Sequence, residues 1–310
     1  MITFDKLKIV SSISNIEILD ETQFKVETKD GYMVTRKYHN ENPYQLDIKI
    51  DYIERELVIE FSGRILGKDY PKLISIQTIG QCFSAINDIG FCLLDIESMM
   101  DADVVKCDVT IDISVDNVPQ LTAFLRNHNN NYQRVLCRKM NNSNLTIEKN
   151  VTTKKLKKRM VVYDKEKEMN KTCNKQFVED NALEGAFDGK CRFELNLNSK
   201  EQIRSSLGIC NTKLKTVLTA DANPILDFLD DVVGSPSGSV SLTDKKTYLT
   251  MLVLKDCDFD LEKVEAKMRD LYPIRGTNFK KVMEPYKMMM EQMGMTEGQD
   301  YWKTIRDQLT

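Results

Sequence analysis

Hydrophobic and polar residues alternate along residues 104–116, VVKCDVTIDISVD. One face of this segment carries the apolar residues Val105, Cys107, Val109, Ile111, Ile113 and Val115. The other face carries Val104, Lys106, Asp108, Thr110, Asp112, Ser114 and Asp116. A period of two over this length predicts a half-buried β-strand. The three aspartates on the second face repel one another, so we expect that water screens them or that a cation lies among them.

Several other segments of the first 204 residues show the same period. Residues 45–53 place Leu46, Ile48, Ile50 and Tyr52 on one side, and residues 55–63 place Leu57, Ile59 and Phe61 on one side. Residues 23–29 alternate as well and stop at an Asp-Gly pair. The segments 156–169 and 189–204 each predict a strand followed by a turn. Together these segments predict a sheet with one apolar and one polar face.

Helical spacing appears between and after these strands. Apolar residues separated by three and four positions predict a helix over 71–90, and they are Leu73, Ile76, Ile79, Phe83 and Ile86. A shorter helix is expected over 118–127, with a proline in its first turn. Near the C-terminus, residues 260–272 and 278–293 also have helical spacing. The fold class is therefore α+β, with a central, largely antiparallel sheet flanked by helices and a helical C-terminal region.

A domain boundary is predicted at residues 234–246, GSPSGSVSLTDKK, where glycine, serine and proline cluster. We expect a sheet-based domain over 1–233 and a mainly helical extension over 234–310. The alternative is that 234–246 forms a surface loop within one domain.

Composition restricts the class of protein. With 310 residues, 41% hydrophobic and 29% charged, the chain is typical of a globular protein. No apolar run approaches the roughly 18 residues of a membrane span, and the N-terminus alternates like a strand, so we expect a cytoplasmic protein without a membrane partner. The net charge of -3 gives no overall sign of nucleic-acid binding. Eight scattered cysteines and two histidines argue against a zinc or histidine-rich metal site.

Isolated carboxylates lie on the polar faces of several predicted strands. Two carboxylates four residues apart on a flat strand are roughly 13 Å apart, so one ion cannot bind both Asp108 and Asp112 and must recruit a neighbouring strand. Oxygen ligands of this kind suit magnesium or manganese. The candidate metal ligands are Glu60, Asp108, Asp112 and Glu194. The alternative is a solvated face on which these acids pair with Lys106, Arg159 or Arg192.

A basic segment, KNVTTKKLKKRMVVYDK, lies between residues 149 and 165. Its cationic residues are Lys149, Lys154, Lys155, Lys157, Lys158, Arg159 and Lys165. Such a block suits a phosphate backbone, although lysines at a solvated hairpin edge also discourage aggregation. Tyr163 follows the basic strand directly. A phenol can attack a phosphodiester when a metal polarises the phosphate and a nearby cation lowers the phenol pKa.

Four short motifs carry a resemblance to a known family. They are Glu60 to Gly63, Asp108 with Asp112, Tyr163 to Glu168, and Arg192 to Glu194. In this order they resemble the E-F/G-S-G, R-x-D-x-x-x-D, Y-D/N-K-x-x-E and R-F-E motifs of rolling-circle replication initiators. These are the initiators of the staphylococcal-plasmid type, together with the gene II-like proteins of filamentous phages. The resemblance covers about residues 45–200.

The resemblance implies a sheet-based nuclease that nicks one strand at a replication origin of a plasmid or phage. A tyrosine becomes joined to the 5′-phosphate, and the freed 3′-hydroxyl primes synthesis. A divalent metal, magnesium or manganese, held by acidic side chains activates the phosphate. The implied partners are origin DNA, a host helicase, a host polymerase and a second copy of the chain. The residues expected to contact DNA are Lys154, Lys155, Lys157, Lys158, Arg159, Lys165 and Arg192.

The chain departs from the family pattern in three places. It has no His-hydrophobic-His pair, and Lys106 replaces an arginine. No tyrosine occurs in NLTIEKNVTTKKLKK, where the family often has a T-L-Y-x-G strand. Tyr163 is therefore the first candidate for the nucleophile, and Tyr132 is the second. Two other functions stay open: a non-catalytic module that recognises an origin, and a metal-dependent nuclease that uses water as its nucleophile.

Overall fold

A computed structural model describes residues 2–127, 135–141, 144–149, 158–233, 245–257, 261–271, 277–298 and 301–309 of the chain. The chain divides into two compact units, residues 1–234 together with 308–310, and residues 235–307. This division falls beside the boundary expected at 233/234. The last three residues belong to the larger unit, where Gln308 accepts a hydrogen bond from the Ser114 backbone N–H and donates one to its carbonyl, at 2.7 and 2.8 Å.

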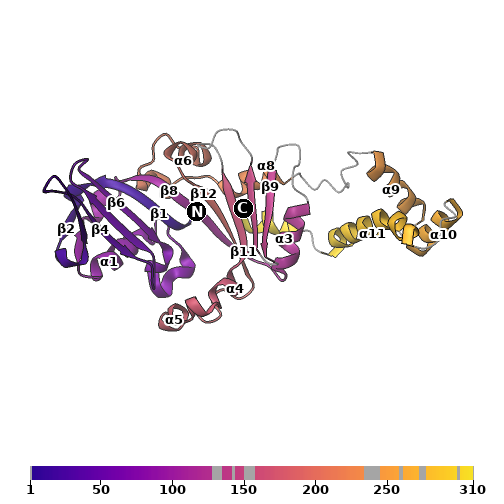
Figure 1. The fold of residues 1–310 in the computed structure, drawn as a ribbon, viewed down its shortest axis with the longest axis horizontal. Coiled ribbons are helices and arrows are strands. Elements are labelled where there is room, and N and C mark those ends of the chain that lie inside the picture. The colour runs from indigo at the N-terminus through magenta and orange to yellow at the C-terminus, as the bar shows by residue number, and fades with distance from the viewer. Residues whose placement is uncertain are drawn as a thin grey trace. The chain divides into compact units, whose positions relative to one another are not determined.

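A large antiparallel sheet organises the larger unit (Figure 1). Among the described residues it has ten strands, and each pairing between neighbours is antiparallel. The strands in spatial order are β3 (Lys25–Lys29), β4 (Tyr32–Asn40), β5 (Leu46–Asp51), β6 (Glu56–Ser62), β1 (Phe4–Ser12), β8 (Asp103–Ser114), β12 (Lys190–Leu197), β11 (Arg159–Asp164), β10 (Asn144–Lys149) and β9 (Val135–Asn141). A small second sheet pairs β2 (Ile16–Ile18) with β7 (Cys92–Leu94). The predicted α+β class with a largely antiparallel sheet is confirmed.

Helices connect and flank these strands. The 3-10 helices are η1 (Ile13–Asn15), η2 (Glu21–Gln23) and η3 (Gly63–Lys72). The α-helices of the larger unit are α1 (Ile79–Asp88), α2 (Ile96–Met99), α3 (Val118–Asn127), α4 (Lys165–Met169), α5 (Thr172–Asp180), α6 (Lys200–Leu207), α7 (Leu214–Leu218) and α8 (Pro224–Val232). Figure 1 shows α4 and α5 at the end of the sheet where β11 stops. The turn expected after the strand within 156–169 is therefore a short helix, which Asp164 caps through a 2.9 Å bond to the Lys167 N–H.

One face of the sheet is apolar because alternate residues of each strand point to the same side. Its central strands supply side chains that are buried completely, namely Phe4, Leu7 and Ile9 of β1, Leu57, Ile59 and Phe61 of β6, and Phe193 and Leu195 of β12. Leu46, Ile48 and Ile50 of β5 are also buried. The predicted apolar sides of 45–53 and 55–63 are thus confirmed for these residues, and the opposite face of the sheet carries the polar residues.

Two irregularities interrupt the pairing of β1 with β8. Lys8 pairs with Lys106 whereas Ile9 pairs with Val104, so Val105 is an extra residue. The extra residue reverses which side chains face the core. Val104 is therefore buried and Val105 only half-buried, and the predicted alternation is wrong at the start of this strand. The second irregularity lies between Phe4 and Lys6 and makes Asp5 an extra residue beside the polar face.

The helix expected over 71–90 begins eight residues later than predicted, at Ile79. Thr78 explains the late start, because its hydroxyl oxygen accepts a bond from the Ser75 N–H at 2.8 Å and donates one to the Leu73 carbonyl at 2.7 Å. A side chain that bonds nearby backbone groups offers the chain an alternative to the helix. Leu73 itself has a positive φ of 57°, which no helical residue has.

The smaller unit is helical. It contains α9 (Lys245–Asp256), α10 (Leu261–Leu271), α11 (Thr277–Gly298) and most of α12 (Tyr301–Leu309). Its core is rich in methionine and consists of Met251, Leu254, Cys257, Val264, Met268, Phe279, Met283 and Met289. Of the Met288–Met290 run, Met289 is a core residue and Met288 is exposed. None of the helices in the described part of the chain has the length and apolar character needed to cross a membrane.

Candidate active site

Three adjacent strands, β8, β12 and β11, bring most of the candidate site residues together on the polar face. The pairing of β8 with β12 sets Asp108 opposite Asn196, Thr110 opposite Glu194, and Asp112 opposite Arg192. The pairing of β12 with β11 sets Arg192 opposite Tyr163. Because residues two apart on a strand share a face, these side chains form a continuous polar surface. The site is therefore built from strands that are distant in sequence.

A hydrogen bond joins the first-choice nucleophile to a carboxylate. The Tyr163 hydroxyl donates to Glu194 Oε1 at 2.6 Å. Burial, followed by the Glu194 charge, raises the pKa of Tyr163 well above its ordinary value. Burial and the nearby charge of Asp5 also raise the pKa of Glu194, to about 7. The lowered phenol pKa expected from the sequence is therefore not found: the phenol keeps its proton at neutral pH, and the carboxylate beside it can accept that proton.

Asp108 is a second carboxylate on the same surface. Its Oδ1 accepts a 2.8 Å bond from the Asn196 amide. Burial raises the pKa of Asp108 from its ordinary value, because the neighbouring lysines compensate only in part. Asp108 and Glu194 are diagonal neighbours across two strands, a relationship that places Cα atoms about 7–8 Å apart. The negative charge of Asp108 contributes to the raised pKa of Glu194.

Arg192 is fully buried and holds three strands and η3 together. Its guanidinium donates to both carboxylate oxygens of Asp112, at 2.6 and 2.7 Å. It also donates to Asp5 Oδ1 at 2.7 Å and to the Tyr70 hydroxyl at 2.8 Å. Contact of Arg192 with a phosphate backbone, as expected from the sequence, is not compatible with this burial. Asp112 is likewise committed to the guanidinium, so its predicted role as a metal ligand is not supported by its surroundings.

Lys165 is also buried, with 1% of its surface exposed. Its ammonium donates to the Tyr70 hydroxyl at 2.8 Å and to Glu168 Oε2 at 2.7 Å. Arg64 reaches the other oxygen of Glu168 at 3.0 Å. Burial and the nearby Arg192 lower the pKa of Lys165. The expectation that Lys165 contacts DNA is therefore corrected, because the residue ties α4 to η3 inside the protein.

Three members of this network are not found by sequence reasoning. Asp5 reaches it through the irregularity in β1, which has no signature in the period of two. Tyr70 lies in η3, next to a segment predicted to be an α-helix. Glu168 is the last residue of the Y-D-K-x-x-E motif, but the motif did not indicate what Glu168 does. Of the three, only Glu168 could have been named from the sequence.

Glu60 lies on the same face but in a different environment. Lys6 and Lys8 bond its two oxygens at 2.7 and 3.1 Å, and Lys106 lies 3.5 Å from one of them. Burial alone would raise the pKa of Glu60, but these lysines lower it to about 2. Three cations already surround Glu60, so it does not fit the expected role of metal ligand.

The described carboxylates show whether the predicted divalent metal could bind. No group of three histidine, cysteine, aspartate or glutamate side chains suited to a metal occurs in the described ranges, so the four predicted ligands do not form one site. Asp108 and Glu194 differ from Glu60 and Asp112, because no described lysine or arginine forms an ion pair with either. Magnesium often binds proteins through one or two carboxylates, with waters and substrate phosphates as its other ligands. Asp108 and Glu194 fit an ion of that kind.

The basic segment is described only at its two ends. Lys154, Lys155 and Lys157 lie outside the described residues, as does the second-choice nucleophile Tyr132. Lys149 forms a 2.5 Å ion pair with Asp231 of α8. Lys158 is half-buried beside Asp231, and burial lowers its pKa. Arg159 is exposed, so among the described predicted DNA contacts it is the one whose side chain faces water.

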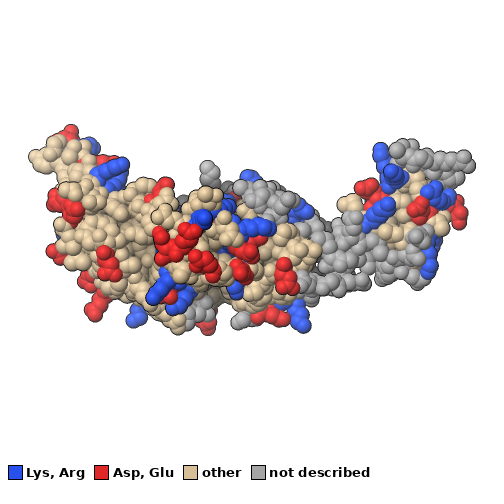
Figure 2. All heavy atoms as spheres, turned by 90° about the horizontal axis from the view of Figure 1, so that it is seen from below, with Lys and Arg blue, Asp and Glu red and all other residues tan. Residues whose placement is uncertain are grey.

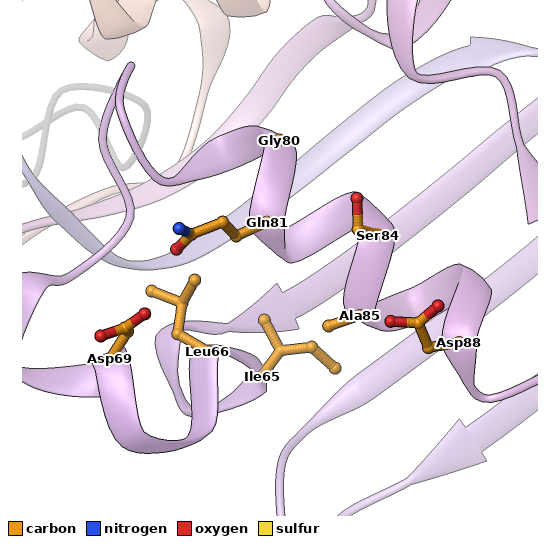
Figure 3. A pocket seen from close by; sticks show the side chains of 8 residues that line it. All are labelled: Ile65, Leu66, Asp69, Gly80, Gln81, Ser84, Ala85 and Asp88. Carbon is orange, nitrogen blue, oxygen red and sulfur yellow. The ribbon is translucent and has the colours of Figure 1, made fainter.

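The surface gives little further indication of a binding site. Figure 2 shows acidic and basic side chains intermixed on the drawn face of the larger unit, without a broad basic patch among the described residues. An open hollow of about 440 Å³ lies between η3 and α1 (Figure 3). Its lining includes Ile65, Leu66 and Asp69, and Asp69 is paired with Lys72 at 2.9 Å. None of the lining residues belongs to the Tyr163–Glu194 site.

Comparisons with known proteins do not assign the chain to a family. No protein-family model matches it, and a search of curated protein sequences finds no match. The functional argument therefore rests on the geometry above and on the order of the motifs.

Proposed function

We propose that this chain is a replication initiation protein that nicks one DNA strand at an origin and starts rolling-circle replication of a plasmid or phage. The observation that carries the proposal is the 2.6 Å hydrogen bond from Tyr163 to Glu194. It pairs a nucleophile with an acceptor for its proton, as covalent catalysis by a hydroxyl group requires. The order of the four sequence motifs is an independent support.

The reaction follows from this pair. The Tyr163 oxygen attacks the scissile phosphorus while its proton passes to Glu194. A bond forms between the phenol oxygen and the 5′-phosphate, and the bond from phosphorus to the 3′-oxygen breaks. The 3′-oxygen takes up a proton and leaves as a free hydroxyl. The carboxylate of Glu194, 2.6 Å from the phenol oxygen, is placed to accept this proton directly.

Asp108 and Glu194 would hold the divalent metal, magnesium or manganese. When bound, the ion would neutralise the charge of the scissile phosphate and make the phosphorus easier to attack. The buried residues support these side chains without touching the substrate. Arg192 links β12 to Asp112 on β8 and to Asp5 on β1, and so fixes the strands that carry Asp108 and Glu194.

The partners follow from the proposed reaction. They are origin DNA, a host helicase that opens the duplex, and a host polymerase that extends the free 3′-hydroxyl. A homodimer and a cytoplasmic location are part of the same proposal. Arg159, four residues before Tyr163 on β11, is the described residue of the basic segment that would contact the DNA backbone.

A second candidate is a metal-dependent endonuclease that uses water. It is favoured by Asp108 and Glu194, two neighbouring carboxylates with raised pKa values that can bind an ion and accept a proton. The two candidates differ in their products. A tyrosine nucleophile leaves protein joined to DNA, whereas water leaves a free 5′-phosphate.

A nicking assay tests the proposal. Supercoiled and single-stranded DNA of the protein's own replicon would be incubated with the full chain and manganese or EDTA, and the products run on a denaturing gel that retains protein–DNA adducts. We expect a metal-dependent adduct that Tyr163→Phe abolishes and Tyr132→Phe retains. Cleavage without an adduct would support the water nuclease. Binding without cleavage would leave a non-catalytic origin-binding module.

A further inference from the structure

The cluster of three lysines around Glu60 has more positive charge than an ion pair requires. Lys6, Lys8 and Lys106 come from two neighbouring strands and converge on one carboxylate at 2.7, 3.1 and 3.5 Å. Glu60 is ionised, since its pKa is about 2. Three lysines and one glutamate give the cluster a formal net charge of +2.

No second described acid forms an ion pair with these lysines. Asp47 lies opposite Glu60 on β5, but its carboxylate bonds His39 at 2.5 Å and Gln45 at 3.1 Å. Asp108 lies opposite Lys6, but the bond that its carboxylate accepts comes from the Asn196 amide at 2.8 Å, and it forms no ion pair with any of the three lysines. Among the described residues, Glu60 is thus the one carboxylate that forms ion pairs with these lysines.

The placement of the lysines is unfavourable for folding alone. Lys8 and Lys106 are directly opposite each other in the β1–β8 pairing. Like charges at opposite positions of an antiparallel pair destabilise it. Their side chains are 38% and 34% exposed, so both can reach an anion in solvent. This pairing destabilises the fold and leaves both ammonium groups accessible to solvent. We therefore expect that an anionic ligand binds them.

The position of the cluster indicates which anion this is. Lys6 is opposite Asp108, and Lys106 precedes Asp108 by two residues on β8, which is about 7 Å along a strand. The cluster therefore borders the site of Asp108, Glu194 and Tyr163 on the same face of the sheet. A phosphate held by the lysines would lie one backbone step from a phosphate held at that site.

We propose that Lys6, Lys8 and Lys106 bind the phosphate backbone of single-stranded DNA next to the scissile phosphate, and that Glu60 offsets one of their three positive charges. The sequence suggested the basic segment 149–165 for DNA contact and a metal for Glu60. The geometry points to a different basic surface and a different role for Glu60. This inference rests on the proposed function for the identity of the strand, but not for the presence of an anion site.

Binding of a fluorescent single-stranded 20-mer of thymidine tests this inference without any cleavage. Anisotropy titrations would be run with the full chain in EDTA, in a Tyr163→Phe background, from 50 to 200 mM salt. Each phosphate contact with a single strand contributes about −0.7 to the slope of log K against log salt. We expect the double variant Lys8→Gln/Lys106→Gln to lower the magnitude of that slope by about 1.4. Lys6 stays in place so that Glu60 keeps a partner.

Three further variants make the test specific. Lys106→Gln alone should lower the slope by about 0.7, and it covers the case in which the double variant does not fold. Lys49→Gln is the matched control, because Lys49 has its own partner in Asp51 at 2.8 Å, and it should leave the slope unchanged. Glu60→Gln should strengthen binding, since it raises the local charge by one.

The outcomes are distinct. An unchanged slope in both lysine variants, or weaker binding in Glu60→Gln, would overturn the inference. Failure of the nicking assay together with the expected salt slopes would remove the proposed reaction and keep the anion site. Normal nicking together with unchanged slopes would keep the proposed reaction and remove the anion site.

Discussion

The guanidinium of Arg192 and the carboxylate of Asp112 form a two-point hydrogen-bonded pair inside the protein, with distances of 2.6 and 2.7 Å. Two parallel bonds of this kind fix the relative position of the groups as well as their charge. The pair spans β12 and β8, the strands that carry Glu194 and Asp108. Asp112 thus supports the two strands that carry the site, although its motif resembles a metal-binding motif.

Asp112→Asn should therefore destabilise the larger unit. The change leaves part of the Arg192 charge buried without its counter-ion, and removal of one partner from a buried pair typically costs about 3–5 kcal/mol. Urea unfolding followed by circular dichroism measures the loss. Asp103→Asn is the control, since Asp103 lies on the same strand in more exposed pairs with Lys200 and Lys213, and it should cost about 1 kcal/mol or less.

Manganese binding to the same variant separates a structural role of Asp112 from a metal-binding role. If Asp112 holds Arg192, manganese binding measured by calorimetry should persist in Asp112→Asn at a temperature where the variant is folded. Loss of manganese binding with little change in unfolding free energy would instead make Asp112 a ligand.

Glu194 should make stability depend on pH near neutrality. Its folded pKa, about 7, lies above the ordinary value of 4.5, so the unfolded chain loses this proton first as pH rises. The contribution of Glu194 to stability is therefore full below pH 4.5 and decreases as the pH rises through 7. The decrease amounts to at most about 3 kcal/mol.

Glu194→Gln removes this titration and keeps an oxygen that can accept the Tyr163 bond. In EDTA, the unfolding free energy of wild type should fall relative to that of the variant between pH 5 and pH 8. Glu201→Gln, an exposed change in the first turn of α6, should run parallel to wild type. A difference between wild type and Glu194→Gln that stays constant over this range would show that Glu194 is ionised throughout.

Periodicity predicted the strands of this fold better than the connections between them. Leu57, Ile59 and Phe61 alternate inward as predicted because the hydrophobic face of a strand repeats every two residues. The pattern failed at Val104 and Val105, where an extra residue changes the register, and such an irregularity depends on the partner strand. It failed again before Ile79, where the Thr78 hydroxyl bonds the backbone and delays the helix.

The candidate site was predictable only in part, for a similar reason. Sequence motifs identified Asp108, Glu194 and Tyr163 on polar strand faces, and the sheet brings them together. The motifs did not indicate which acids have cationic partners. Whether Glu60 meets three lysines and Asp112 an arginine depends on strand order, which a single sequence does not state. Asp5 enters the network through the irregularity in β1, and Tyr70 enters it from η3.

The two units should respond separately to core substitutions. Leu254 is completely buried in the methionine-rich core of the smaller unit. Truncation of a buried leucine typically costs about 2–5 kcal/mol, so Leu254→Ala should destabilise residues 235–307. Hydrogen exchange followed by mass spectrometry should show faster exchange in α9 to α11 and unchanged exchange in β1, β8 and β12. Faster exchange throughout the chain would mean that the two units unfold together.

The central claim is that the phenol of Tyr163 becomes bonded to DNA, and peptide mapping tests it most directly. The full chain would be incubated with manganese and single-stranded origin DNA, digested with nuclease and protease, and analysed by mass spectrometry. The account predicts a nucleotide attached through phosphate to the peptide that contains Tyr163, and its absence in Tyr163→Phe. Cleaved DNA with the nucleotide on another residue, or with no modified peptide, would contradict the account.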